Sequence, residues 1–265
     1  MRLTILSTLL FAGTALSAVS AQAAGELNLI CSADVVICEQ MKGDFEKSHD
    51  IKVNMVRLSS GETYAKVRAE ARNPKTDIWW AGTGDPHMQA ASENLTLEYK
   101  SPMLDQLQDW AVKQAESTGY RTVGVYAGAL GWGYNTEIFK SKGYKEPKCW
   151  ADLLAPELKG EIQIANPNSS GTAYTALASL VQIMGEDQAI DYLKKLNANI
   201  SQYTKSGSAP VKAAARGETA LGIVFMHDAV AQTAEGFPVK SIAPCEGTGY
   251  EIGSMSIIKG ARNLD

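Results

Sequence analysis

Three strand–turn–helix units follow one another in the first third of the chain, and this order constrains the fold more than any other feature. The stretches 26–31, 51–57 and 76–81 have the alternating or apolar character of strands, and apolar residues at helical spacing predict helices at 35–49 and 63–72. Such an order favours parallel strands joined by crossover helices. We therefore predict an α/β chain with mostly parallel sheets.

A glycine-dense extended run, 124–135, suits a crossover between two lobes. Beyond it we expect a short helix at 149–154, strands at 161–166, 220–226, 239–243 and 252–258, and helices at 173–184 and 187–196. The run 220–226 is almost continuously apolar, as in the centre of a parallel sheet.

The length of the chain allows two domains, since one domain usually takes about 100–200 residues. We expect lobe 1 at 25–124, lobe 2 at 125–250 and a return of 251–265 toward lobe 1. Each lobe is expected to hold a central, mostly parallel sheet flanked by helices.

The first 24 residues predict a secretory signal peptide. Arg2 precedes an apolar stretch, 3–16, and Ala21-Gln22-Ala23 matches a cleavage site with small residues. A membrane anchor is the alternative, but the apolar core is shorter than the ~20 residues that a spanning helix needs. No cysteine stands at the cleavage point, so lipid attachment there is not indicated. We expect export to the periplasm.

Composition narrows the classes of partner. The chain is 45% hydrophobic and 20% charged, which is enough apolar mass for a packed core. Its net charge of −4 provides no general field for attracting nucleic acid. It provides no broad field for anions either, so local dipoles and hydrogen-bond donors would have to hold an anionic ligand.

The four cysteines favour disulfides, because their count is even and the chain is expected to be exported. Three pairings are possible. We favour the short loop Cys31–Cys38, which leaves Cys149–Cys245 as a long-range link; free buried thiols are the alternative. The spacings match no zinc site.

Polar turns follow several predicted strands and lead into helices. They contain hydroxyls or glycines at Ser32, 59–61, 82–84, 169–172 and 206–208. Such turns gather at the carboxyl ends of parallel strands, where helix N-termini favour anions. The alternative is that each serine only caps its helix, which is worth ~1 kcal/mol. Ser169, Ser170 and Thr172 provide more hydroxyls than one cap needs.

A second polar group follows the apolar strand 220–226. His227, Asp228 and Glu251 together suit sugar hydroxyls, which need both acceptors and donors. As alternatives, Asp228 caps a helix starting at Ala229, His227 is a satisfied core histidine, or the three residues form a metal site. Glu251 is expected in a loop before a strand.

Three further side chains have simpler interpretations. Trp79 and Trp80 are adjacent on a strand and face opposite ways, so core packing is the default for both and cleft stacking by one is the alternative. His87, beside Pro86, is expected at the surface.

Enzyme motifs are missing from the sequence. It contains no G-x-S-x-G, P-loop or dinucleotide fingerprint, and Ser256–Lys259 matches S-x-x-K only by letters, inside an apolar strand. We therefore expect a binding protein with no catalytic residues and no cofactor.

Three segments carry a family resemblance: Asp77–Pro86, Ser169–Tyr174, and Arg216-Gly217-Glu218 ahead of Gly222-Ile223. They resemble the ferric-type extracellular solute-binding proteins of ABC importers, over essentially the whole mature chain. The resemblance implies a monomeric, type II-like, two-lobed protein that closes on a solute in the interlobe cleft and docks on an inner-membrane permease.

The iron binders of this family carry adjacent tyrosines where Met226, His227 and Asp228 stand here, so the resemblance is nearer to a branch that binds hexose phosphates. That branch implies sugar contacts from His227, Asp228 and Glu251, and phosphate contacts from Ser169, Ser170 and Thr172. Further phosphate contacts are implied for Ser32, Thr83 and Ser206. Ser60 lies in the serine turn 59–61 and Arg57 just before it, so we expect them to add a hydroxyl and a charge partner for the phosphate.

Alternatives to a sugar phosphate are a phosphonate or other organophosphate, ferric iron, or hydrolysis of a phosphate ester. Relatives also end in helices that pack back on the lobes, and this sequence stops before them. We therefore expect apolar surface that such helices would cover.

Overall fold

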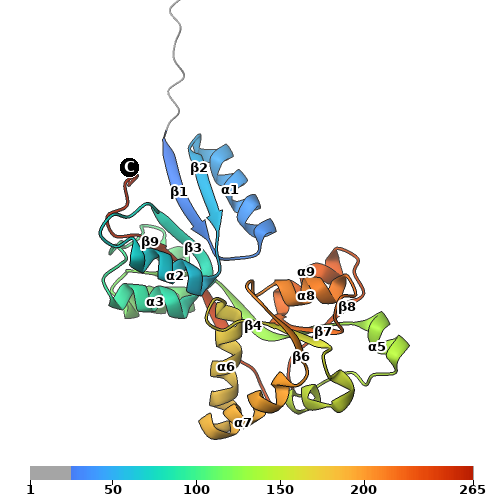
Figure 1. Ribbon diagram of the computed structural model, residues 1–265. Helices are drawn as coiled ribbons and strands as arrows, with labels where there is room; N and C mark the ends of the chain where they lie inside the picture. The colour runs from blue at the N-terminus through green and yellow to red at the C-terminus, as the bar shows by residue number, and fades with distance from the viewer. Residues whose placement is uncertain (1–24, 265) are drawn as a thin grey trace, which may run out of the picture.

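The computed structural model describes residues 25–264, so the expected signal peptide lies outside the described residues. Figure 1 shows two α/β lobes that are joined at a narrow waist, where β4 (Val123–Asn135) passes from one lobe to the other. This architecture confirms the expected two-lobed fold. Among residues 25–264, none of the helices combines the length and apolarity needed to cross a bilayer.

Lobe 1 is built on the strand order β2-β1-β3-β9, with the first half of β4 at the edge. Its strands are β1 (Glu26–Cys31), β2 (Lys52–Arg57), β3 (Ile78–Thr83) and β9 (Tyr250–Ile257). Its helices are α1 (Val35–His49), α2 (Ser60–Ala69), α3 (Gly84–Ser92) and α4 (Asp109–Ser117), with a 3-10 turn η1 at Leu104–Gln106. Strand β1 is parallel to both β2 and β3, as the crossover helices require.

Lobe 2 continues the sheet from the second half of β4 in the order β7-β5-β6, while β8 pairs with the other edge of β4. Its strands are β5 (Ile162–Ala165), β6 (Ile200–Thr204), β7 (Leu221–Phe225) and β8 (Val239–Ile242). Its helices are α5 (Thr136–Lys142), α6 (Gly171–Met184), α7 (Glu186–Asn197), α8 (Ala209–Ala215) and α9 (Met226–Ala234), with 3-10 turns η2 (Trp150–Leu154) and η3 (Pro156–Leu158).

The largest buried cluster lies in lobe 2 and includes Trp132 and Trp150, whose rings meet edge to face with centroids 5.2 Å apart. Every strand residue of β7 is buried, which confirms its central position in the sheet. A smaller cluster around Trp79 and Val67 packs lobe 1.

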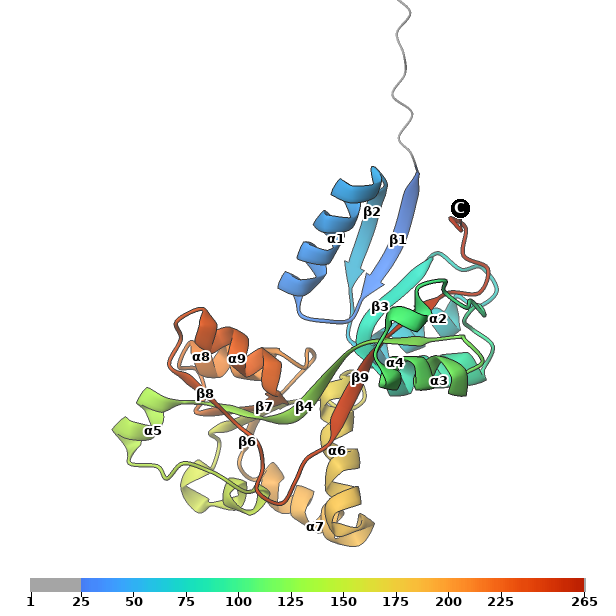
Figure 2. The same cartoon turned by 180° about the vertical axis from the view of Figure 1, so that it is seen from behind.

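The sheets are mixed rather than mostly parallel. All the antiparallel pairings involve β4 or β9, and the pairings of β1 and of β5 with their neighbours are parallel. Strands β4 and β9 cross the waist side by side, as Figure 2 shows. Because these two strands pass between the lobes, no crossover helix sets their direction: β9 runs antiparallel to β3 in lobe 1, and β4 runs antiparallel to β7 and β8 in lobe 2.

Two disulfides form, with the pairing that the spacing favoured. Cys31–Cys38 links the end of β1 to α1, and both residues are fully buried. Cys149–Cys245 links the start of η2 to the segment that returns from lobe 2 to β9.

Candidate ligand-binding site

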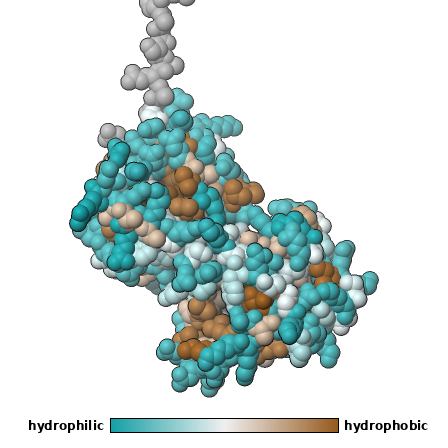
Figure 3. Space-filling view, viewed as in Figure 1, coloured by the Kyte–Doolittle hydropathy of each residue, from teal (hydrophilic) through white to brown (hydrophobic). Residues whose placement is uncertain are grey.

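A cavity of about 370 Å³ lies between the lobes. This size falls within the range of small-molecule sites. Lobe 1 contributes the ends of β1, β2 and β3, lobe 2 contributes the starts of α6, α8 and α9, and β4 and β9 form the floor. In Figure 3 the lobes meet at a waist whose surface is largely pale or teal, with brown patches on each lobe.

Nine of the eleven predicted ligand contacts line this cavity: Ser32, Arg57, Ser60, Thr83, Ser170, Thr172, His227, Asp228 and Glu251. Ser169 and Ser206 are not among the residues that line it. The Ser169 hydroxyl donates to the carbonyls of Asn166 (3.2 Å) and Lys205 (3.3 Å), and Ser206 Oγ accepts from Arg57 (3.0 Å). Both serines are thus used in contacts within and between the lobes.

Four hydroxyls form a donor cluster, defined as Ser60, Thr83, Ser170 and Thr172. Ser60 Oγ accepts from the N–H of Thr83 (3.2 Å), and Ser170 Oγ accepts from Ala173 at the start of α6 (3.5 Å). A hydroxyl that accepts one bond keeps its own proton to donate. Thr83 Oγ1 is buried and has no hydrogen-bond partner among residues 25–264. Since buried polar groups are normally paired, this hydroxyl points to a ligand.

Ser32 lines the cavity but is committed to the protein. Its Oγ accepts from Trp79 Nε1 (3.0 Å) and lies 3.0 Å from Thr63 Oγ1. Because the Thr63 hydroxyl donates to the Ser59 carbonyl (3.1 Å), Ser32 must donate its proton to Thr63. In this arrangement Ser32 offers a ligand only a lone pair.

The end of β3 is shaped to present Thr83. The pairing of β3 with β9 shifts register between Trp80 and Thr83, and Ala81 and Gly82 have positive φ angles of 65° and 88°. A Cβ on Gly82 would also lie 2.5 Å from Ser60 Oγ. Both the positive φ and the close approach of Ser60 therefore require glycine at this position. The run 82–84, expected as a turn, is instead the end of β3 followed directly by α3.

Arg57 spans the two lobes. Its guanidinium donates to the Ala33 carbonyl (3.0 Å) and Ser59 Oγ (3.2 Å) in lobe 1 and to Ser206 Oγ (3.0 Å) in lobe 2. Burial lowers the pKa of Arg57, while Asp34 and Glu62 oppose this effect, and an arginine keeps its charge at neutral pH. Two of its five N–H groups are left for an anion.

Two carboxyl groups form the acidic part of the site. Burial, aided by the charge of Asp34, raises the pKa of Asp228 to about 7. Burial and repulsion from Asp228 raise the pKa of Glu251 well above its usual value. A protonated carboxyl group donates one hydrogen bond and still accepts others, which suits hydroxyl groups of a ligand.

The local positions of these two carboxyls differ from expectation. Helix α9 begins at Met226, so Asp228 lies in its first turn and is not the N-cap; that position belongs to Phe225. Glu251 lies inside β9, opposite Gly128 of β4, rather than in a loop. The strand pairing extends to Tyr250 because β4 provides a long partner edge.

His227 is not a core histidine, since its side chain is 40% exposed. It stacks on Phe225 with ring centroids 5.7 Å apart. A Cβ on Gly128 would lie 2.7 Å from His227 Nδ1, so the glycine lets β4 pass beneath the imidazole. Burial lowers the pKa of His227, which favours the neutral ring with one donor and one acceptor.

The aromatic pair divides between core and cavity. Trp79 is fully buried, and Trp80 lines the cavity. The surface position expected for His87 is wrong: the residue is buried, stacks on Trp79 at 3.7 Å and hydrogen-bonds Ser256 Oγ at 2.8 Å. Burial lowers the pKa of His87 to about 3, so the ring is neutral.

Sequence reasoning missed Asp34 and Tyr126. The Tyr126 hydroxyl accepts from the N–H of Gly82 (3.2 Å), and Asp34 contacts both lobes. An N-cap signal before α1 marks Asp34 locally, since its side chain accepts from Val36 N. No local pattern reveals its partners in lobe 2.

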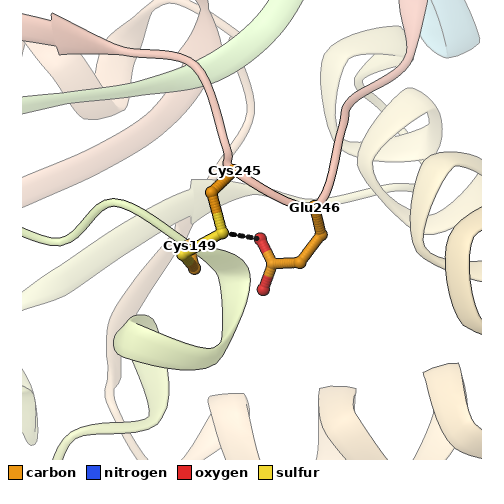
Figure 4. A group of neighbouring side chains, drawn as sticks. All are labelled: Cys149, Cys245 and Glu246. Carbon is orange, nitrogen blue, oxygen red and sulfur yellow. Dashed lines mark hydrogen bonds between the residues drawn. A yellow bond between two sulfur atoms is a disulfide. The ribbon is translucent and has the colours of Figure 1, made fainter.

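One group of described residues has the spacing of metal ligands, namely Cys149, Cys245 and Glu246. Figure 4 shows the two sulfurs joined in the disulfide and the carboxylate beside them. The Glu246 carboxylate accepts from the N–H groups of Trp150 (2.7 Å) and Ala151 (3.1 Å), and so caps η2. Disulfide sulfurs are not thiolates, so this group is structural.

Comparison with known proteins places the chain in a family. Residues 73–264 match the family described as bacterial extracellular solute-binding protein. The chain belongs to this family. An uncharacterized protein of Haemophilus influenzae is 48% identical over 264 residues, which cover 99% of this chain and 76% of that protein.

Two solved structures are similar at substantial identity. The periplasmic binding protein AfuA of Actinobacillus pleuropneumoniae, with fructose-6-phosphate bound, is 50% identical with a TM-score of 0.88. The periplasmic binding protein P5PA is 39% identical with a TM-score of 0.86. In both cases the match covers 91% of this chain and 76% of the other.

Iron-bound HitA from Pseudomonas aeruginosa shares the fold alone, at 18% identity and a TM-score of 0.73, over 89% of this chain and 76% of that one. The two structures that are 50% and 39% identical to this chain are both described as periplasmic binding proteins, and the family to which the chain belongs is described as extracellular.

Proposed function

We propose that this solute-binding protein captures a phosphorylated sugar in the interlobe cavity and delivers it to an ABC permease in the inner membrane. The observation that supports the proposal most directly is that one cavity joins the donor cluster, with its unpartnered Thr83 hydroxyl, to the carboxyls of Asp228 and Glu251. A sugar phosphate needs both kinds of surface, because its phosphate accepts hydrogen bonds and its hydroxyls donate as well as accept them.

The phosphate fits the donor cluster. Ser170 and Thr172 lie at the start of α6, a 14-residue helix whose N-terminal N–H groups and dipole favour an anion. Ser60 is the first residue of α2, and Thr83 is the N-cap of α3. The two remaining N–H groups of Arg57 add positive charge. This arrangement holds an anion without a general positive field, consistent with the acidic net charge of the chain.

The sugar fits the remaining walls. Asp228, Glu251 and His227 offer polar groups for hydroxyls, while Trp80 and Phe225 provide apolar surface for a pyranose or furanose face. A structure 50% identical to this chain contains fructose-6-phosphate, which supports a phosphorylated sugar as the ligand class.

We infer that the lobes, 25–124 and 125–250 with a return at 251–265, move about β4 and β9. In the present structure they touch across the cleft, since Gly61 N donates to the Ser169 carbonyl at 3.0 Å. Closure of this kind buries the ligand and creates the shape that a permease recognises. We further propose that the protein acts as a periplasmic monomer and that binding is not followed by turnover.

Calorimetric titration with glucose 6-phosphate and fructose 6-phosphate tests the proposal, with glucose and inorganic phosphate as controls. Saturable binding of the sugar phosphates, and weak binding of either control, is expected because each control leaves half of the polar groups unpaired. Asp228→Asn should weaken binding of the sugar phosphates strongly and that of phosphate little. Equal affinity for phosphate and sugar phosphate would contradict the proposal.

The alternatives lead to different results. A phosphonate binder would titrate with 2-aminoethylphosphonate and would tolerate Asp228→Asn. A ferric protein would be coloured and sensitive to chelators, but burial and Glu251 raise the pKa of Tyr126 well above its usual value, which opposes a phenolate ligand. A hydrolase would turn over p-nitrophenyl phosphate, and we expect no turnover.

A further inference from the structure

Asp34 of lobe 1 is held by two side chains of lobe 2. Its Oδ2 accepts from Ser208 Oγ at 2.8 Å and lies 2.6 Å from Lys212 Nζ. Its Oδ1 accepts from Val36 N at 3.1 Å, within its own lobe. The carboxylate is 12% exposed and the Lys212 side chain 30% exposed, so solvent screens this pair only in part.

Both sides of this contact are anchored within their own lobes. Asp34 is the N-cap of α1, and the Cys31–Cys38 disulfide closes the short loop that contains it. Lys212 lies on α8, where its neighbours Val211 and Ala215 pack in a buried cluster of lobe 2. Anchored partners lose little conformational entropy when they meet, so the contact is favourable once the lobes close.

The contact also removes an electrostatic obstacle. Asp34 lines the cavity, where an unpaired carboxylate would repel an anionic ligand. Burial tends to raise the pKa of Asp34, but hydrogen bonds from Lys212, Val36 and Ser208 outweigh it and hold the pKa below its usual value. Lys212 of lobe 2 does not itself line the cavity, but its positive charge offsets that of Asp34, which does.

We propose that Asp34, Ser208 and Lys212 form an interlobe clasp that holds the lobes shut and sets how long the ligand stays bound. The inference rests on closure of the lobes around an anionic solute, as proposed above. Another charged pair also crosses the cleft, Lys205 with Glu62 at 3.5 Å, but the Lys205 side chain is 85% exposed. Exposed pairs contribute little, so Lys205 provides a matched control.

The test is stopped-flow binding of glucose 6-phosphate to the full-length protein and its variants. Lys212→Met keeps most of the aliphatic stem and removes the charge; we expect dissociation about tenfold faster and association within twofold, because the clasp forms after capture. Lys205→Met should change dissociation less than twofold. Dissociation from Lys212→Met that matches Lys205→Met would overturn the clasp.

Asp34→Asn tests the pairing, since asparagine still caps a helix. It should speed dissociation as Lys212→Met does, and the double variant should be no faster than either single variant, because both remove one interaction. Fully additive effects would overturn the pairing.

The clasp can also be tested without a bound ligand. If the wild-type protein binds no sugar phosphate, the proposed function fails, and small-angle X-ray scattering of the ligand-free proteins then tests the clasp. A larger radius of gyration for Lys212→Met than for wild type and Lys205→Met supports it. Identical radii would overturn it.

Discussion

Gly61 is placed where closure of the lobes leaves no room for a side chain. It is the second residue of α2, and its N–H donates to the Ser169 carbonyl of lobe 2 at 3.0 Å. A Cβ at this position would lie 2.6 Å from the Asn168 carbonyl oxygen and 3.1 Å from that of Ser169. Its φ is not positive, so alanine is compatible with lobe 1 by itself. Gly61→Ala should therefore penalise only the closed state.

The size of the penalty follows from the geometry. A Cβ does not approach an oxygen to 2.6 Å, and both neighbours are backbone atoms that cannot rotate away, so the lobes must separate by several tenths of an ångström. Overpacking of this kind costs about 1–3 kcal/mol. Because ~1.4 kcal/mol corresponds to a factor of ten, the Kd should rise about 5- to 150-fold.

Titration calorimetry and thermal unfolding of the ligand-free protein measure the two effects separately. Gly43→Ala is the matched control, since Gly43 lies in α1 with no described atom within 4 Å of a new Cβ. Both variants should keep or raise the Tm, because alanine is favoured over glycine in helices by up to ~1 kcal/mol. If the Kd of Gly61→Ala for glucose 6-phosphate is within twofold of that of Gly43→Ala, the closed arrangement described here is not the state that binds the ligand.

Three further predictions follow from individual groups. Thr83→Val should weaken sugar-phosphate binding about tenfold without lowering the Tm of the ligand-free protein, because this hydroxyl has no partner within residues 25–264; a lower Tm in thermal unfolding would contradict this. The raised pKa of Asp228, from 3.8 to about 7, means that the folded state holds a proton that the unfolded state has lost across this window. Stability should therefore fall as the pH rises from about 4 to about 7, by at most ~4 kcal/mol, and urea unfolding of Asp228→Asn should show a flatter profile. Replacing both Cys149 and Cys245 by serine removes a disulfide between residues that are 96 apart in the sequence. The free energy of unfolding, measured in the same assay, should fall by about 2–4 kcal/mol. An unchanged free energy of unfolding would show that this disulfide does not stabilise the protein.

The sequence by itself determined the local elements and the type of chemistry. Helix α1 matches the predicted range because apolar spacing and its N-cap act within a few residues. The apolar run at β7 marked a buried central strand, and the polar residues at the ends of β1, β2 and β3 marked the ligand edge. These signals depend on periodicity and hydrogen bonds close in the sequence, which do not require knowledge of distant partners.

Only the tertiary structure decided which polar groups are free and which are already paired. Ser32 follows β1 and Thr83 is the last residue of β3. Trp79 and Thr63 hydrogen-bond Ser32, whereas Thr83 Oγ1 is left without a partner in the described chain. His87 is buried although Asp85, Met88 and Gln89, which lie close to it in sequence, are exposed.

The same holds for contacts between the lobes. Asp34 meets Ser208 across 174 residues, and Arg57 meets Ser206 across 149. Hydrophobic periodicity carries no information about residues so far apart in the sequence. These partners are decided by how the two lobes close around the cavity, not by local propensity. The sequence therefore determined that the chain carries a site for a polar solute, and closure of the lobes decided which residues bind the solute and which bind each other.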